Sequence, residues 1–321
     1  MDKEVECIIS DLIDSYNNII IFKSDFFDIF FKVLKYLQRN KIINIAFCFR
    51  KNFLIINGFN EFNIFYHIKF PFYTNENIQS KYVYKWKINE SLESCPLISL
   101  DVLLKSSSSP DHFQYISFSI DDSSFIIHKL DKENVQRISF DYIEEADYTP
   151  STFELEETLL SIVGDGAKVY SFNPLYILEI KDIFRSENIR IAIKSNLMFM
   201  NMKNTVDNIS YTNVVLLNTF PDSIVQLYIY WIFRQYLPMD IVKNFIINPQ
   251  KPSKLSNLHY IDENNDEECF IQTKLFINLL SIYKLVKIAY ISLNQWNDED
   301  ENNKFKFGGK GEELEFLLIQ L

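Results

Sequence analysis

The spacing of apolar and polar residues predicts a short helix followed by alternating strands, and this pattern recurs about four times along the chain. The clearest copy begins at Asp25. Phe26, Phe30 and Leu37 recur there at helical spacing, which places them on one face of a helix. Strand-like segments with alternating apolar residues follow over 42–70. The pattern therefore predicts an α+β protein built from four helix-plus-strands units.

Local signals place the boundaries of several elements. We expect the four helices at 25–41, 99–105, 173–185 and 273–287. Ser99 is a good N-cap for the second helix, and Asn173 followed by Pro174 is a typical start for the third. The pair Asn57 and Gly58 is the strongest hairpin signal. It predicts a turn between strands at 53–56 and 62–70.

The rhythm of the units also predicts the domain organisation. Residues 1–18 read as an N-terminal extension, either a short helix or a frayed segment. A first domain is expected over 19–143 and a connector over 144–167, where acidic residues and Pro150 break the pattern. The second domain is expected over 168–321, interrupted by an insertion at about 218–266.

Net charge alone argues against a polyanionic partner, but its distribution reverses that conclusion. The chain carries a net charge of −11. The four predicted helices hold ten basic and five acidic residues, so the rest of the chain has a net charge of −16. A basic face on an acidic protein can still bind phosphate by releasing counterions. The candidate phosphate-facing residues are Lys32, Lys35, Arg39, Lys41, Lys105, Lys181, Arg185, Lys274 and Lys284.

Catalytic and metal chemistry find no support in the residue pattern. The four cysteines lie far apart without C-x-x-C spacing, and the four histidines lack ligand spacing. No Ser/His/Asp or Cys/His arrangement can be assembled. The glycine-rich stretch 308–311 lacks the frame of a phosphate loop and is expected to be a hairpin turn. The sequence thus predicts a protein that is not an enzyme and needs no cofactor or metal.

Targeting signals are equally sparse. No run approaches the roughly 18 apolar residues that span a bilayer, so we expect no membrane partner. The N-terminus lacks the basic and apolar regions of a secretory signal. We therefore expect a protein that is not secreted, nuclear in a eukaryote and otherwise cytoplasmic.

Two stretches resemble a known family. The segment LISLDVLLKSSSSPDHFQYISFSIDDSSFIIHKLDKENVQRISFDY, at 97–142, resembles the second half of the first domain of a DNA sliding clamp. The segment beginning VYSFNPLYILEIKDIFRSENIRIAI, over 169–216, resembles the first half of the second domain. The type is that of proliferating-cell nuclear antigen, and the insertion and the long connector are most similar to a subunit of the heterotrimeric DNA-damage checkpoint clamp.

The resemblance implies a two-domain clamp fold with helices on a concave face and antiparallel sheets outside. Two further clamp subunits would complete a trimeric ring around double-stranded DNA, contacting its phosphate backbone without reading sequence. A clamp loader and repair, checkpoint or replication partners would bind near the connector, at 144–162. Two alternatives stay open: a homotrimeric polymerase processivity clamp, including one of viral origin, and a protein-only interaction scaffold with no DNA binding.

Overall fold

The computed structural model describes residues 3–61, 64–73, 78–89, 97–107, 113–121, 123–131, 134–143, 170–178, 188–194, 196–204, 209–219, 267–293, 305–311 and 313–320. The chain forms two compact units. Unit 1 comprises Met1–Thr149 and Glu312–Phe316, and unit 2 comprises Pro150–Gly311 and Leu317–Leu321. The last strand, β18 (Glu315–Gln320), is divided between them.

Unit 1 contains two antiparallel sheets. One has the strand order β5-β1-β7-β8-β9, and the other has the order β4-β3-β2-β6, with the start of β18 beside β4. The elements of unit 1 are α1 (Lys3–Ser15), β1 (Asn18–Lys23), α2 (Asp25–Arg39), β2 (Asn44–Arg50), β3 (Phe53–Phe59), β4 (Ile64–Pro71), β5 (Val83–Ile88), β6 (Leu97–Ser99), α3 (Leu100–Ser107), β7 (Tyr115–Ile120), β8 (Ser124–Leu130) and β9 (Val135–Asp141).

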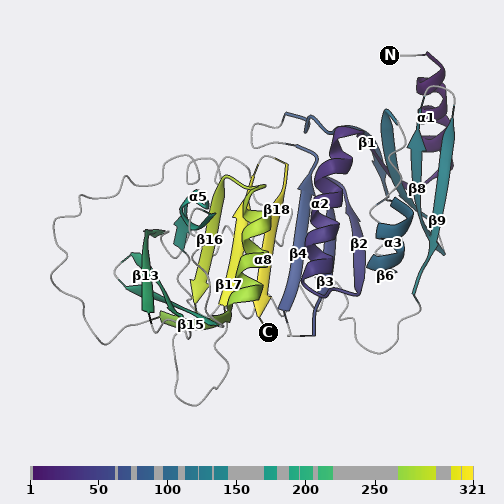
Figure 1. The fold of residues 1–321 in the computed structure, drawn as a ribbon. Coiled ribbons are helices and arrows are strands. Elements are labelled where there is room, and N and C mark those ends of the chain that lie inside the picture. Colours follow the sequence, from purple (N-terminus) through teal and green to yellow (C-terminus); the bar gives the residue numbers. More distant parts are fainter. Residues whose placement is uncertain are drawn as a thin grey trace. The chain divides into compact units, whose positions relative to one another are not determined.

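An aromatic core joins α2 to both sheets of unit 1. The Phe30 ring lies 4.7 Å from that of Phe118 on β7, between ring centroids, and Phe26 lies 5.2 Å from Phe70 on β4. All four side chains are buried. Aromatic pairs at these separations attract one another beyond the area that they bury. The apolar face predicted for this helix is therefore its packing face, and α2 lies across β2, β3 and β4 (Figure 1).

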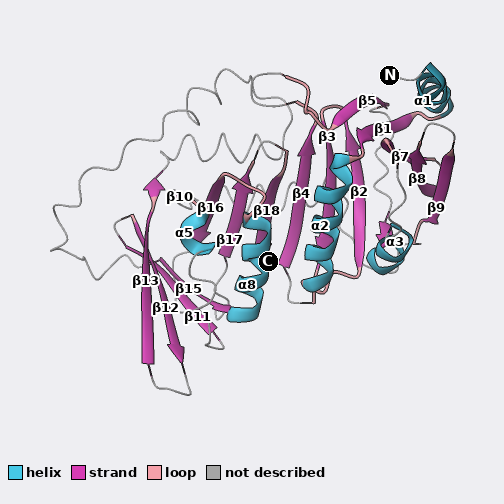
Figure 2. Cartoon of the chain, turned by 45° about the horizontal axis from the view of Figure 1, so that its top comes forward, coloured by secondary structure: helices cyan, strands magenta, loops and turns pink. Residues whose placement is uncertain are grey.

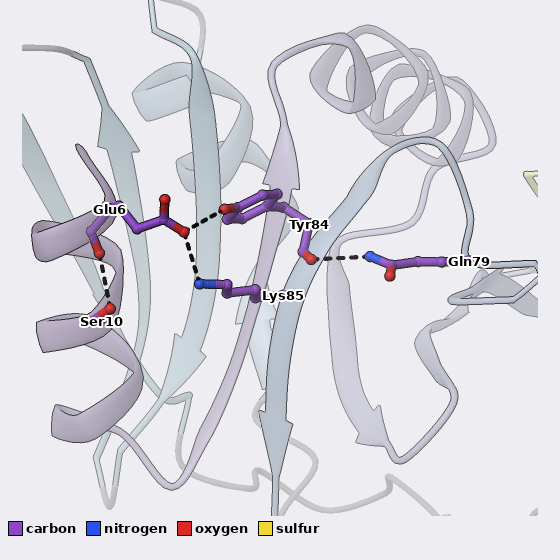
Figure 3. A network of polar contacts seen from close by, with 5 residues as sticks. All are labelled: Glu6, Ser10, Gln79, Tyr84 and Lys85. Carbon is purple, nitrogen blue, oxygen red and sulfur yellow. Dashed lines mark hydrogen bonds and ion pairs between the residues drawn. The ribbon is translucent and has the colours of Figure 1, made fainter. Parts of the chain in front are cut away.

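The N-terminal segment is a helix, α1, which covers the other face of the β1-containing sheet. Val5 and Ile9 are buried against Ile19 and Ile21 of β1. The Glu6 carboxylate accepts hydrogen bonds from Tyr84 (3.0 Å) and Lys85 (3.2 Å) on β5 (Figure 3). These two bonds lower the pKa of Glu6. The predicted extension is thus an amphipathic helix attached to the outer face of this sheet.

The predicted Asn57-Gly58 turn is wrong, because both residues lie inside β3. Asn57 Oδ1 lies 2.9 Å from His67 Nδ1 on the neighbouring β4. A Cβ on Gly58 would stand 2.9 Å from Ile42 Cγ2, so glycine makes room for that side chain. The turn comes after Phe59 instead, where Asn60 Oδ1 accepts the Ile64 N–H at 3.0 Å. Tertiary contacts override the local turn preference here.

Unit 2 repeats the plan of unit 1. Its sheets have the orders β13-β12-β11-β15 and β14-β10-β16-β17 (Figure 2). The elements of unit 2 are β10 (Tyr170–Phe172), α5 (Leu175–Leu178), β11 (Asn188–Lys194), β12 (Leu197–Asn204), β13 (Ile209–Leu216), β14 (Asn218–Thr219), β15 (Glu267–Gln272), α8 (Thr273–Tyr283), β16 (Ile288–Leu293) and β17 (Phe305–Lys310).

The strand pairings of the two units correspond one to one. Strand β1 pairs with β5 and β7, as β10 pairs with β14 and β16. Strand β2 pairs with β3 and β6, as β11 pairs with β12 and β15. In this correspondence β13 takes the place of β4, and β18 takes the place of β9. The predicted repetition of helix-plus-strands units is confirmed.

Several predicted boundaries can be compared with the described elements. Asn173 Oδ1 accepts the Leu175 N–H at 3.0 Å, which confirms the predicted start of the third helix. Gly308, Gly309 and Lys310 lie in β17, paired with β16, so the hairpin turn predicted there is wrong. Glycines in a strand satisfy the ladder through their backbone alone. The connector at 144–167 and most of the insertion at 218–266 lie outside the described residues.

His67 makes the stability of unit 1 depend on pH. Burial first, and then the nearby Lys69 ammonium, lower the pKa of His67 from 6.5 to about 3. The neutral ring is therefore the folded form, and its Nδ1–H donates to Asn57 Oδ1. Because the unfolded chain binds a proton below about pH 6.5 and the folded chain does not, stability falls as the pH drops from about 6.5 to about 3.

We expect the variant His67→Gln to lose this pH dependence. Between about pH 7 and pH 5, the free energy of unfolding of the unaltered protein should fall by about 2 kcal/mol more than that of the variant. Denaturant titrations of both proteins at the two pH values measure the difference, and all other titrating groups are common to both. The same decrease in both proteins would contradict the assignment.

Candidate nucleic-acid interface

Three cations form an outward stripe on α2. Lys32, Lys35 and Arg39 are exposed and lie within an arc of about 60° on the helix, opposite its buried face. That buried face consists of Phe26, Phe30, Val33, Leu34, Tyr36 and Leu37. No ion pair to Lys32 or Lys35 occurs within the described part of the chain. The core packing of α2 therefore directs these side chains away from the sheets.

The charges along α2 follow its dipole. Asp25 and Asp28 lie in the first turn and Arg39 in the last. Acidic groups stabilise the positive N-terminal end of a helix, and basic groups stabilise the negative C-terminal end. Helix stability alone therefore explains part of this charge pattern. The basic residues lie on the exposed face of the C-terminal half of α2.

Lys41 lies beyond the predicted helix rather than on it. Helix α2 ends at Arg39, and Lys41 adopts a left-handed conformation with φ 62°. Its ammonium forms an ion pair with Glu61 from the turn between β3 and β4. This correction separates Lys41 from the stripe, because its charge is offset by an adjacent carboxylate.

Helix α3 adds one exposed cation next to α2. Helices α2 and α3 are joined by a hydrogen bond of 2.8 Å from Gln38 Nε2 to Asp101 Oδ1. Lys105 is exposed on α3, and so is the apolar Val102, which is 51% exposed. Helices α2 and α3 together carry four basic side chains and three carboxylates, so their combined net charge is only weakly positive.

In unit 2, the structure describes part of the predicted basic set. Lys274 is exposed on α8, whose buried side consists of Phe276, Leu279, Ile282 and Tyr283. Lys284 is exposed at the C-cap of α8, about 80° away from Lys274 around the helix axis. Lys181 and Arg185 lie outside the described residues. The structure therefore places seven of the nine predicted cations, and four of these lie on the adjacent helices α2 and α3.

A row of aromatic rings next to the stripe was not predicted as part of a site. Phe27 and Phe31 are half-buried on the flank of α2, with ring centroids 5.6 Å apart and planes at 20°. The Lys35 ammonium stands 4.5 Å from the Phe31 centroid. Lys129 of β8 lies 5.8 Å from the Phe27 centroid and 5.7 Å from that of Phe113. The i, i+4 spacing of residues 27, 31 and 35 was the sequence signal that could have predicted this row.

Two other classes of site have no basis in the described residues. No group of three or more His, Cys, Asp or Glu side chains there could hold a metal ion. None of the helices that the structure describes is both long and apolar enough to cross a membrane.

Comparison with known structures identifies the fold. The chain is similar to proliferating cellular nuclear antigen from Entamoeba histolytica, with a TM-score of 0.56 and 11% identity, over 95% of this chain and 98% of that one. It is equally similar to a structure of the PCNA2–PCNA3 complex from Sulfolobus tokodaii, with a TM-score of 0.56 and 12% identity, over 94% and 98% of the two chains. The chain has a sliding-clamp fold.

The clamp fold confirms the predicted α+β class and the arrangement of helices with antiparallel sheets. No family model matches the sequence, and no curated protein does. At 11–12% identity, the likeness lies in the order and pairing of elements and extends over nearly the whole chain.

Proposed function

We propose that this chain is a non-enzymatic subunit of a ring-shaped clamp that encircles duplex DNA and tethers repair, checkpoint or replication proteins. The observation that carries the proposal is the clamp fold over 94–95% of the chain. The outward stripe of Lys32, Lys35 and Arg39 supports it, because cations on helices contact phosphates without reading bases. Binding of this kind is independent of sequence and allows sliding.

The correspondence between the units supports ring formation. Strand β4 has the start of β18 as its neighbour, whereas its counterpart β13 pairs only with β12 among the described strands. Likewise, β18 has neighbours on both sides, whereas its counterpart β9 pairs with β8 alone in the part of the chain that the structure describes. The edges of β9 and β13 are therefore matched, and in the proposal β9 of one subunit pairs with β13 of the next. Such head-to-tail contacts close into a ring and protect exposed strand edges.

For the subunit composition, we propose a heterotrimer similar to the checkpoint clamp. The connector and the insertion predicted from the sequence support this composition, and one of the structural neighbours is itself a complex of two different proteins. A homotrimeric processivity clamp is the second candidate, because one chain carries both matched edges. A loader and partner proteins are proposed to bind near 144–162, and the domain limits and nuclear location remain predictions.

Reversing charge on α2 tests DNA binding. In the variant Lys32→Glu with Lys35→Glu, retention of the assembled ring on circular duplex DNA should be lost or strongly reduced, because two phosphate contacts become repulsive. The slope of log affinity against log salt should fall by about 2. Retention assays over a range of salt concentrations measure both effects.

The matched control is Lys23→Glu with Lys51→Glu, which changes net charge equally at exposed positions outside the helices. The control should keep its retention on DNA. If the α2 variant also remains on DNA like the unaltered protein, the duplex-binding proposal fails and the protein-only scaffold is favoured.

Native mass measurement tests the ring edges. Alone, the chain should be a monomer of 38.1 kDa if it needs two other subunits, and a trimer if it forms a homotrimer. Val135 on β9 is 43% exposed and Val214 on β13 is 48% exposed, so lysine at both positions is compatible with folding. We expect Val135→Lys with Val214→Lys to prevent trimer assembly, with or without partner subunits, because charges protect strand edges from pairing. Full assembly of this variant would rule out these edges as the interface.

A further inference from the structure

The row formed by Phe27, Phe31 and Lys35 on α2 presents aromatic rings on the same helix as the cationic stripe. Each member lies four residues after the previous one, so the three side chains follow one line along the helix. The two rings are half-buried, whereas Lys35 is exposed. A surface that contacts only phosphate needs cations but no aromatic rings. The partly accessible phenylalanine rings beside Lys35 therefore suggest an additional kind of contact.

The contact between Lys35 and Phe31 can be exchanged for a ligand. The ammonium lies 4.5 Å from the ring centroid, at the end of a flexible and exposed side chain. An exposed cation–π contact is weaker than the stacking of a nucleic-acid base on a ring. A base can therefore take the place of the ammonium over Phe31, while the Lys35 ammonium moves to the phosphate of the same nucleotide.

Buried contacts fix the Phe27 end of the row. Lys129 is only 3% exposed and stands 5.8 Å from the Phe27 centroid and 5.7 Å from that of Phe113. Phe113 meets Phe27 edge-on, with centroids 5.5 Å apart. These contacts hold Phe27 in place, and Phe27 in turn supports Phe31.

We propose that Phe27, Phe31 and Lys35 form a stacking site for unpaired bases of single-stranded DNA. Bases inside a duplex are already stacked and paired, so only a single strand offers free base faces. Phenylalanine has no hydrogen-bonding group, and the site therefore accepts any base. The inference rests on the proposed function and adds to it a contact with the single strand at a junction between single- and double-stranded DNA.

The test uses the full chain, assembled with its partner subunits if it requires them, and an oligothymidylate of about 30 nucleotides. In the variant Phe31→Leu, the side chain stays apolar but has no aromatic face. We expect its affinity for the oligothymidylate, measured by fluorescence anisotropy, to fall by about 5- to 150-fold, the range for one base–aromatic stack. Retention on circular duplex DNA should not change.

Two further variants keep the result decisive. Phe31→Tyr preserves the ring and should bind the oligothymidylate as the unaltered protein does. Phe59→Leu alters an aromatic residue outside the row, on β3 and 44% exposed, and should have no effect. Unfolding midpoints of all variants show whether a loss reflects folding, and Phe31→Tyr then decides whether the ring itself is needed.

The outcomes separate this inference from the proposed function. If Phe31→Leu binds the oligothymidylate normally, or if Phe31→Leu and Phe59→Leu lose affinity equally, the stacking site is ruled out. A failure of the unaltered protein to bind the oligothymidylate rules it out as well. The clamp proposal is tested apart from this, by the effect of Lys32→Glu with Lys35→Glu on duplex retention.

Discussion

The packing of the α2 phenylalanines against both sheets of unit 1 is the interaction on which the candidate interface depends. Phe26 and Phe30 contact β4 and β7 from one helix, so they fix how α2 is rotated about its own axis. That rotation decides which residues face water. With the buried side occupied by these rings, Lys32 and Lys35 have to point outward, and the cationic stripe follows from the apolar core rather than from attraction between charged groups.

The same rotation places Phe27 and Phe31 at the boundary between core and solvent. There they are neither fully buried nor separate from the cations, and Lys35 rests on the outer ring. The surface is thus mixed: weakly basic overall, with charge and aromatic area concentrated along α2. The proposed phosphate contact uses the exposed lysines, whereas the rings suit the proposed stacking of unpaired bases.

The repetition of one plan in two units has a separate consequence. Strands β4 and β18 are neighbours in a sheet, whereas their counterparts β13 and β9 lie at the edges of the described sheets. A repeated fold with two matched edges favours assembly with further subunits, because exposed strand edges are otherwise prone to aggregation.

The sequence by itself determined the α+β class, the order of helices and strands and the stripe of Lys32, Lys35 and Arg39, because periodicity and capping act over a few residues. It failed at Asn57 and Gly58, whose turn preference is overridden by contacts with His67 and Ile42 from other elements. Only the tertiary structure decided that Lys41 pairs with Glu61 and that Lys129 lies under Phe27. These contacts join residues far apart in the chain, so no local pattern encodes them.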